Sequence, residues 1–540
     1  MGIAPKPPLW YSDLDSQIKA GQIASASQAL EVLRAKNLPR AEQVWLAELF
    51  RRVGKGKAAL EILTPYVRPP ARVRSVPTEH EKSEYAGALI RVGLMGEALA
   101  LLESLPEPRA PLAIHYLTLA HMARWDFERA FGLLRKLSEH PRATEYQRVL
   151  AAVNLTSALL NLGLFEETEV HLAKWLPQLE NSGYRLLYGI TLDFAGQSAM
   201  LANRLPEAKL RLERALAAVG TAQNAIYSLY VRKSMALLKL KMSLDGYGQP
   251  DLTDYAAVYE EARQKRMWEV LRDLEFHRAW ILRDMEMMAR VYFGTRHPHF
   301  RQRVVRVVKQ LGLKLPTHYL WVPPPEAGLP DGSLGPPRLV MHMADGRIEG
   351  ARASRIFEGF KPGQLLHRLA KALAGDFYHP LDLATLHGEL FPGRPFNLRS
   401  SPQVVHQALR RLRRQWERAG LPFQVICEAG EYRLQATFKK PIKSGQSRPN
   451  NPGMPLNSPA SPIGVRWEHT PGSGGARLTA ALQKVGAAFG TTPFSSVEAA
   501  EILNTGKVTA VALLNEAVTL GLLGREGQAR STRYRAVLAE

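Results

Sequence analysis

A phrase of similar character occurs five times between residues 51 and 216, and it constrains the fold of this chain more than any other feature. Each copy joins a helix end, a short turn and a following amphipathic helix, as in LNLGLFEETEVHLAKWL. Alignment of the copies brings a small residue to one position, at intervals of 39, 32, 38 and 40 residues: Ala59, Ala98, Ala130, Thr168 and Ala208. Stacked repeats of this length bury a continuous core between neighbouring units. The sequence therefore predicts a mainly α-helical solenoid.

The phrase resembles the tetratricopeptide family, whose unit is about 34 residues long. The likeness rests on a small residue early in the second helix and a Leu four residues later, as in Ala98 and Leu102. The family's Trp near the start of each unit and its closing Pro are missing. The resemblance thus implies a degenerate helical solenoid, which we assign to residues 1–315. Its groove is expected to bind a protein, a peptide or a small effector.

Residues 222–312 continue the helical pattern less regularly. They predict at least two further long helices, the first of which is capped by Asp251 or Thr253. Aromatic residues also occur at helical spacings in the solenoid, and such residues more often fill a core than bind a ligand: Tyr85, Tyr116, Trp125, Trp175 and Tyr188.

Two segments rich in proline divide the rest of the chain. Residues 316–337 include WVPPPEAGLPDGSLGPP, in which repeated proline prevents a helix. Residues 438–476 are rich in Pro, Ser, Asn and Gly, which predicts a flexible linker. The sequence therefore predicts a second domain at 338–437 and a third at 477–540.

The second domain begins with strands, continues with three helices and ends with a hairpin. RLVMHMADGRIEG predicts a first hairpin that turns at Asp345 and Gly346. Helices are expected around GQLLHRLAKALAG, DLATLHGELF and SPQVVHQALRRLRRQWERAG. The closing hairpin FQVICEAGEYRL turns at Ala429 and Gly430, and Cys427 is expected to pack within its strand.

The third of these helices has two contrasting faces. Helical spacing places its apolar residues together on one side: Val405, Ala408, Leu409, Leu412 and Trp416. The opposite side carries polar and basic residues, with His406, Arg411 and Arg413 on its flanks: Gln403, Gln407, Arg410, Arg414 and Arg418. Arg can bind guanine edges and Gln adenine edges in the major groove of DNA. A charged face that is merely solvated is the alternative, but the order of the surrounding elements favours DNA.

The second domain resembles the winged-helix effector domain of the OmpR/PhoB response regulators. VVHQALRRLRRQW is similar to the family's recognition helix, LHGELF lies where its positioning helix does, and GEYRL resembles the end of its wing. By position, the resemblance implies that these residues face double-stranded DNA: Arg399, Gln403, Gln407, Arg410, Arg411 and Arg414. The wing from Glu428 to Arg433 would approach a minor groove, a contact that Glu431 weakens.

The chain departs from response regulators because no receiver domain precedes this domain, so the resemblance does not extend to phosphorelay control. A repeat array joined to a winged helix also resembles activators of the SARP type, although there the DNA-binding unit usually comes first. These resemblances imply a bacterial, cytoplasmic transcription regulator.

The third domain is expected to be a second small winged helix. Ser495 and Glu498 form a capping-box pattern at the start of its second helix. Its third helix is mostly apolar, so its basic residues would hold phosphates rather than read bases. A second set of DNA contacts is therefore expected at Lys507, Thr509, Arg525, Arg530 and Arg533. Contact with a protein, including a homodimer partner, is equally compatible with this pattern.

Charge and motifs limit the function further. The chain has 71 Lys and Arg against 50 Asp and Glu, a formal charge of +21 that attracts polyanions. We expect no membrane span and no signal peptide, and the single cysteine fits a reducing cytoplasm. His297 and His299 are interpreted as loop residues rather than metal ligands. We find no motif for catalysis, a metal or a cofactor.

Three functions remain compatible with the sequence. The first is a DNA-binding transcription regulator whose solenoid senses or docks a partner. The second is an interaction scaffold whose winged helices mediate protein contacts or dimerisation. The third is RNA binding, although no series of aromatic residues suits stacked bases. Arg410 and Arg414 discriminate best, because regulation through DNA requires them.

Overall fold

The computed structural model describes most of the first 316 residues and parts of the remainder. The described residues are 7–19, 22–69, 76–106, 109–221, 224–245, 250–316, 318–321, 339–342, 348–350, 364–418, 423–436, 465–468, 481–482, 484–489, 492–519, 523–526 and 532–536.

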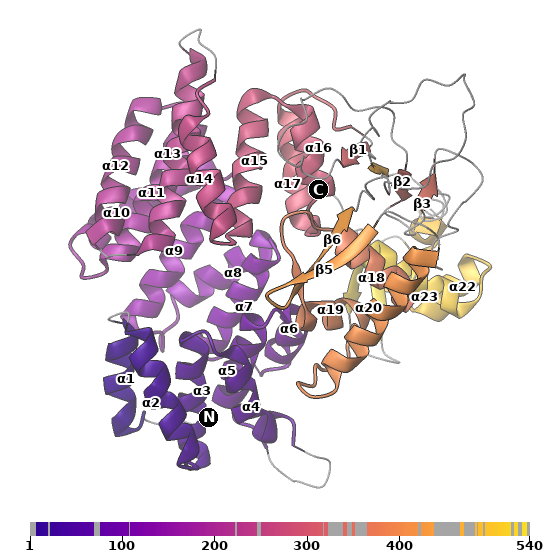
Figure 1. The fold of residues 1–540 in the computed structure, drawn as a ribbon, viewed down its shortest axis with the longest axis horizontal. Helices are drawn as coiled ribbons and strands as arrows, with labels where there is room; N and C mark the ends of the chain where they lie inside the picture. The colour runs from indigo at the N-terminus through magenta and orange to yellow at the C-terminus, as the bar shows by residue number, and fades with distance from the viewer. Residues whose placement is uncertain are drawn as a thin grey trace, which may run out of the picture.

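Residues 9–310 form a solenoid of successive helices, which follow one another as antiparallel neighbours (Figure 1). The helices are α1 (Leu9–Lys19), α2 (Ile23–Ala35), α3 (Arg40–Arg52), α4 (Gly56–Val67), α5 (Glu79–Arg91), α6 (Met95–Glu103), α7 (Pro111–Ala123), α8 (Phe127–Ser138), α9 (Glu145–Leu162), α10 (Phe165–Glu180), α11 (Arg185–Leu201), α12 (Leu205–Thr221), α13 (Ala225–Asp245), α14 (Thr253–Gln264), α15 (Trp268–Leu282), α16 (Met285–Phe293) and α17 (Pro298–Gln310). None of the described helices is long and apolar enough to cross a membrane. The chain is thus mainly helical, with a tetratricopeptide-like solenoid, as predicted.

The small residues that define the repeat lie where two helices of a pair approach each other. All five are at most 1% exposed: Ala59, Ala98, Ala130, Thr168 and Ala208. Gly196 on α11 shows how close the approach is, because a Cβ there would lie 2.6 Å from the side chain of Leu212 on α12. The predicted register is therefore confirmed, and its physical reason is close packing of helix pairs.

Polar caps fix the starts of several helices. Thr78 with Glu81 begins α5 and Thr144 with Gln147 begins α9, each as a complete capping box. The predicted start of α14 needs a correction, because its N-cap is Leu252. Asp251 contributes differently: its Oδ1 accepts a hydrogen bond from the Thr253 backbone N–H at 2.9 Å.

The described residues from 364 to 436, which we call the middle block, contain three helices and a small sheet. Its elements are α18 (Leu365–Ala374), β4 (Leu381–Asp382), α19 (Leu383–Leu390), α20 (Ser401–Arg418), β5 (Phe423–Glu428) and β6 (Glu431–Ala436). The antiparallel sheet has the order β4-β6-β5. The hairpin turns at Ala429 and Gly430 as predicted, with φ angles of 51° and 82°. Cys427 is exposed rather than packed, because it lies close to the hairpin tip.

A separate four-stranded sheet has the order β1-β7-β2-β3. Its strands are β1 (His318–Trp321), β2 (Leu339–His342), β3 (Ile348–Gly350) and β7 (Val465–Glu468). β2 and β3 pair antiparallel as the first hairpin requires, while the turn residues Asp345 and Gly346 lie outside the described residues. β1 and β7 fall within the two segments expected to be linkers. Short runs with aromatic residues, HYLW and VRWE, therefore pair where the surrounding proline masked any strand signal.

The last described elements form a small unit of their own. They are α22 (Ser496–Ile502), α23 (Lys507–Thr519), β8 (Leu523–Glu526) and β9 (Arg533–Ala536), after helical residues at 484–489. β8 and β9 pair antiparallel. The capping box of Ser495 and Glu498 forms as predicted.

The middle block packs against two separate parts of the solenoid (Figure 1). At α6, the Phe396 backbone N–H donates to Glu97 Oε2 at 3.0 Å, and the Phe396 ring joins the core of the first solenoid helices. At α16, Phe293 belongs to the core of the block itself. The Tyr378 hydroxyl also donates to Glu275 of α15. Two distant turns of the solenoid are therefore joined through one block.

Candidate nucleic-acid interface

The turn before α20 fixes where that helix begins. Asn397 Oδ1 accepts hydrogen bonds from the backbone N–H groups of Arg399 at 2.9 Å and Ser400 at 3.0 Å. The Ser401 hydroxyl in turn accepts from the Asn397 backbone N–H at 2.9 Å. This side-chain turn leaves Arg399 exposed immediately before the helix.

The apolar face of α20 is buried in the block, as predicted. Each of its predicted core residues is at most 1% exposed: Val405, Ala408, Leu409, Leu412 and Trp416. Trp416 is among the largest fully buried side chains of the described residues. Burial of a side chain of this kind contributes roughly 1.5–3 kcal/mol. The orientation of α20 is therefore set by its apolar face.

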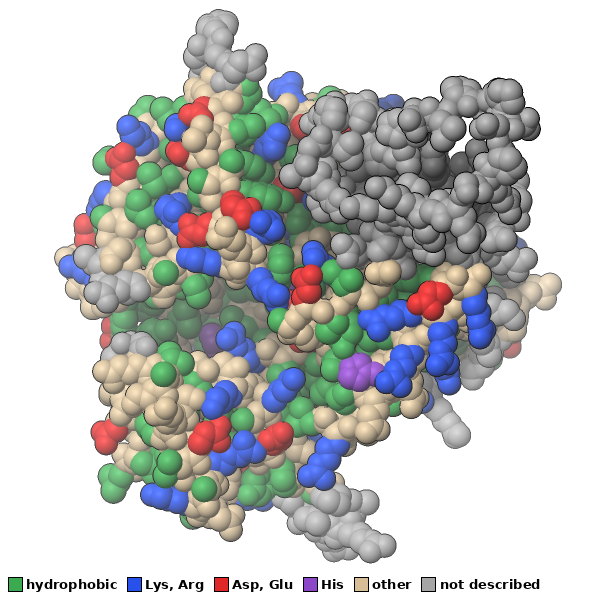
Figure 2. Space-filling model, in the orientation of Figure 1, with side chains coloured by type: hydrophobic (Ala, Val, Ile, Leu, Met, Phe, Trp, Pro, Cys, Tyr) green, Lys and Arg blue, Asp and Glu red, His purple; other side chains and the backbone are tan. Residues whose placement is uncertain are grey.

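The opposite face of α20 is open to solvent. It carries exposed side chains at Gln403, Gln407, Arg410, Arg411, Arg414 and Arg418. Figure 2 shows a row of blue basic side chains along this part of the molecule. The structure thus brings six of the seven predicted residues together on one helix face, and Arg399 lies just before it.

This face has a strong excess of positive charge. α20 contains five arginines and one acid, Glu417. Among the residues that the structure describes, no carboxylate lies within 4.0 Å of Arg410, Arg411 or Arg414. An uncompensated basic helix attracts phosphate groups.

Two other side chains of α20, those of Arg413 and His406, contact the hairpin. Arg413 donates from Nη2 to the backbone oxygen of Val425 on β5 at 2.6 Å. His406 Nε2 lies 3.0 Å from the Tyr432 hydroxyl on β6. Burial raises the pKa of Tyr432 to about 12, so its hydroxyl is neutral and can donate to His406. Two side-chain contacts therefore join the helix to the hairpin.

The hairpin is also tied to the solenoid. Glu431 forms an ion pair with Arg266, which lies in the turn between α14 and α15, at 3.4 Å. Arg433 pairs with Glu428 across the hairpin at 3.1 Å. The charges of the hairpin that were expected near a minor groove are thus engaged with protein groups.

The second predicted set of DNA contacts is only partly described. Arg533 is exposed and pairs with Glu498, the capping residue of α22, at 3.1 Å. Lys507 and Thr509 lie on α23 and Arg525 on β8, and the positions of their side chains are outside the description. Arg530 also lies outside the described residues.

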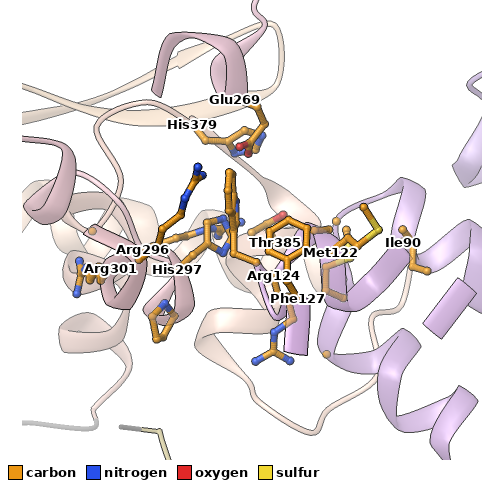
Figure 3. A pocket seen from close by; sticks show the side chains of 18 of the residues that line it. Ile90, Met122, Arg124, Phe127, Glu269, Arg296, His297, Arg301, His379 and Thr385 are labelled. Atoms are coloured by element: carbon orange, nitrogen blue, oxygen red, sulfur yellow. The ribbon is translucent and has the colours of Figure 1, made fainter. Parts of the chain in front are cut away.

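A large cavity between the solenoid and the middle block was missed by the sequence reasoning (Figure 3). Its volume is about 2830 Å³, and twelve Lys and Arg but seven Asp and Glu line it among the described residues. These residues come from positions 68 to 431, so no local pattern could bring them together. His297 lies in the loop before α17, as predicted, and is the N-cap of that helix, whereas the interpretation of His299 as a loop residue was wrong because it lies in the first turn of α17. No grouping of three potential metal ligands occurs in the described part of the chain.

Comparisons with known proteins give likeness in fold alone. No protein family and no curated protein matches the sequence. A Podosopora anserina putative kinesin light chain with nearly identical TPR-like repeats is similar over 34% of this chain and 94% of its own, with 21% identity and a TM-score of 0.27. The apo form of RapI covers 56% of this chain and 97% of its own, with 10% identity and a TM-score of 0.36. The pentatricopeptide repeat protein PPR10 from maize is similar over 58% of this chain and 45% of its own, with 14% identity and a TM-score of 0.23. These weak likenesses add nothing about function, and the solenoid rests on the chain's own helix pairs.

Proposed function

We propose that this protein is a DNA-binding transcription regulator in which the middle block is a winged helix and α20 enters the major groove. The observation that carries the proposal is the exposed basic face of α20 on a helix whose other face is fully buried. The solenoid would then sense or dock a partner. A second copy of the chain and the small C-terminal unit could extend the DNA contact.

The chemistry of the exposed face suits base reading as well as phosphate binding. Gln403, Gln407, Arg410 and Arg414 follow the spacing of one helix face and span roughly 16 Å of helix. Arg offers two parallel donors for the O6 and N7 atoms of guanine, and Gln pairs in the same way with adenine. Arg399, Arg411 and Arg418 lie at the margins, where phosphates would be reached.

An interaction scaffold is the second candidate function. The contacts of the middle block with Glu97 and Glu275 favour it, because they show that this block is already engaged in protein–protein packing within the chain. In that case the basic face of α20 would be a solvated surface or would bind an acidic protein.

Binding of the full-length protein to genomic DNA fragments across a salt series tests the proposal. The double variant Arg410→Ala, Arg414→Ala is expected to lose the selected fragments. Arg411→Ala, Arg418→Ala, which removes two of the proposed phosphate contacts, should instead make the slope of log affinity against log salt shallower by about two, since each lost phosphate contact removes roughly 0.9. The control is Arg142→Ala, Arg185→Ala, which removes the same charge from exposed positions of the solenoid. Equal, unselective binding by the wild type and the α20 variant would reject the regulator in favour of the scaffold.

A further inference from the structure

One corner of the large cavity is built from two turns that contact each other directly. The turn at residues 294–297 precedes α17, and the loop at 375–380 follows α18. The Phe377 backbone N–H donates to the Gly294 backbone oxygen at 2.8 Å. A Cβ on Gly294 would lie 2.3 Å from the Phe377 ring, so the contact requires glycine. We call this place the α17 corner.

The α17 corner gathers basic side chains from four places in the fold. The side chains of Arg296 and His297 come from the first turn, His379 from the second, Arg124 from the end of α7 and Arg301 from α17. Figure 3 shows these five residues around the cavity. Positions separated by more than 250 residues thus meet at one cavity wall.

Donor groups in this corner are incompletely used. Arg296 Nη1 is buried and has no hydrogen-bond partner among the described residues. Its neighbouring carboxylates are too distant for a hydrogen bond, with Glu389 at 3.8 Å and Asp376 at 3.9 Å. Arg301 uses Nε for the backbone oxygen of Tyr292 at 3.1 Å. A buried N–H group without a hydrogen bond is unfavourable unless a ligand or water satisfies it.

The acids near the corner offset only part of its positive charge. Asp376 accepts hydrogen bonds from the backbone N–H groups of Tyr378 and His379, at 3.0 and 2.9 Å. The Glu389 side chain is half exposed. A third acid, Glu269, pairs with the buried Arg272 rather than with the corner. Three arginines therefore face two carboxylates at the corner itself.

The ionisation of His297 reflects the same excess of charge. Burial lowers its pKa well below the usual 6.5, and the nearby basic groups Arg272, Arg296, His379 and Arg124 lower it further. The charged groups that act most strongly on this imidazole are thus all positive, so His297 is neutral in the corner. A site with this potential favours an anion.

We propose that the α17 corner binds a small molecule through a phosphate group. Twelve Lys and Arg line the cavity against seven Asp and Glu, an excess that suits a phosphate dianion, and arginines bind phosphate through paired N–H donors. The cavity also exceeds the roughly 300–1,000 Å³ of ordinary small-molecule sites, which leaves room for the rest of the ligand. Arg306 and Lys309 continue the basic lining along α17 and suit a second phosphate. This proposal goes beyond DNA binding and does not depend on it.

Calorimetric titration of the full-length protein with inorganic pyrophosphate tests the proposal. Arg296→Gln is expected to weaken binding at least tenfold. Arg124→Gln should weaken it several-fold, and because Arg124 is exposed this second variant keeps the result interpretable if Arg296→Gln unfolds the corner. Arg185→Gln, an exposed charge on α11, is the matched control and should bind as the wild type does.

Two further titrations determine which anion the corner prefers and where on the protein it binds. Citrate should bind at least tenfold more weakly than pyrophosphate, and equal affinity would overturn the assignment to phosphate. The α20 variant Arg410→Ala, Arg414→Ala should retain full pyrophosphate affinity. If this variant loses that affinity, the anion binds on α20 instead. Absence of binding to the wild type, or unchanged affinity in both Arg296→Gln and Arg124→Gln, would refute the proposal.

Discussion

Gly93 is the residue at which the contact between the solenoid and the middle block can be tested most sharply. It lies in the turn between α5 and α6 with a φ of +84°, a conformation that glycine adopts without strain. A Cβ added there would lie 2.4 Å from Thr385 Oγ1 and 3.6 Å from the carboxylate of Asp382. Gly93→Ala should therefore strain the turn and also push α19 away from the solenoid.

The two effects have separate magnitudes. A left-handed backbone costs a residue other than glycine about 1–2 kcal/mol. Removal of the overlap requires a shift of about 1 Å at a packed contact, and overpacking of this kind costs about 1–3 kcal/mol. Rotation of Thr385 relieves the overlap in only one of its two other staggered rotamers, because the other puts a methyl group in the place of the hydroxyl. The total expected for Gly93→Ala is thus about 2–5 kcal/mol.

Two other glycines separate strain from contact. Gly163 ends α9 with a φ of +79° and has no atom within 4 Å of an added Cβ, so Gly163→Ala should cost only the backbone strain. Gly96 lies in α6 with the same open space and no positive φ, so Gly96→Ala should be neutral or stabilise by up to about 1 kcal/mol. Chemical denaturation would measure the loss, and hydrogen exchange of the α19 amides would locate it. If Gly93→Ala lowers the free energy of unfolding no more than Gly163→Ala does, and the α19 amides stay protected from exchange, Gly93 does not contact Thr385 as described.

Three further predictions concern buried polar groups. Tyr378→Phe removes the hydroxyl that donates to Glu275 and should cost about 1–3 kcal/mol in denaturation, whereas Tyr146→Phe at an exposed position should change nothing. Burial and the neighbouring Glu84 raise the pKa of Glu48 to about 7. Its folded pKa lies above the usual 4.5, so the stability that protonation contributes is lost as pH rises from about 4.5 through 7. Glu48→Gln should flatten this part of the pH profile of thermal unfolding, and an unchanged profile would contradict the assignment. Phosphate binding at the α17 corner should raise the lowered pKa of His297, so pyrophosphate should bind with proton uptake and more tightly as pH falls. Titrations in buffers of different ionisation enthalpy measure this uptake. If His297→Gln still takes up the proton, a group other than His297 is responsible.

The sequence predicts those parts of the molecule whose pattern is local. The repeat register at Ala59 and Ala98 follows from the size of a side chain that must fit between paired helices. The two faces of α20 follow from a 3.6-residue period, with Trp416 on one side and Arg414 on the other. The hairpin turn at Ala429 and Gly430 follows from turn chemistry.

The contacts that join the solenoid to the middle block have no such local pattern. Phe396 has the sequence surroundings of a loop residue, yet it packs among solenoid helices and bonds to Glu97, 299 residues away. Gly294 gives no sign that an aromatic ring must rest on it. A similar limit applies to His297, whose lowered pKa depends on charges from four different segments. Such features depend on tertiary packing, so they leave no recognisable pattern in a single sequence.

The arrangement of α19 and α20 suggests how the two proposed sites would communicate. α19 is held between the solenoid and α20, with Thr385 against Gly93, while the basic face of α20 is turned to solvent. The α17 corner borders the same block from the other side, through Arg296 and Asp376. A ligand that changes the distance between α6 and α17 must therefore strain one of the block's two contacts and alter the position of α20. Because coupling between two binding equilibria is reciprocal, DNA must change pyrophosphate affinity by the same factor as pyrophosphate changes DNA affinity. Unequal factors would show that at least one of the two ligands also binds elsewhere.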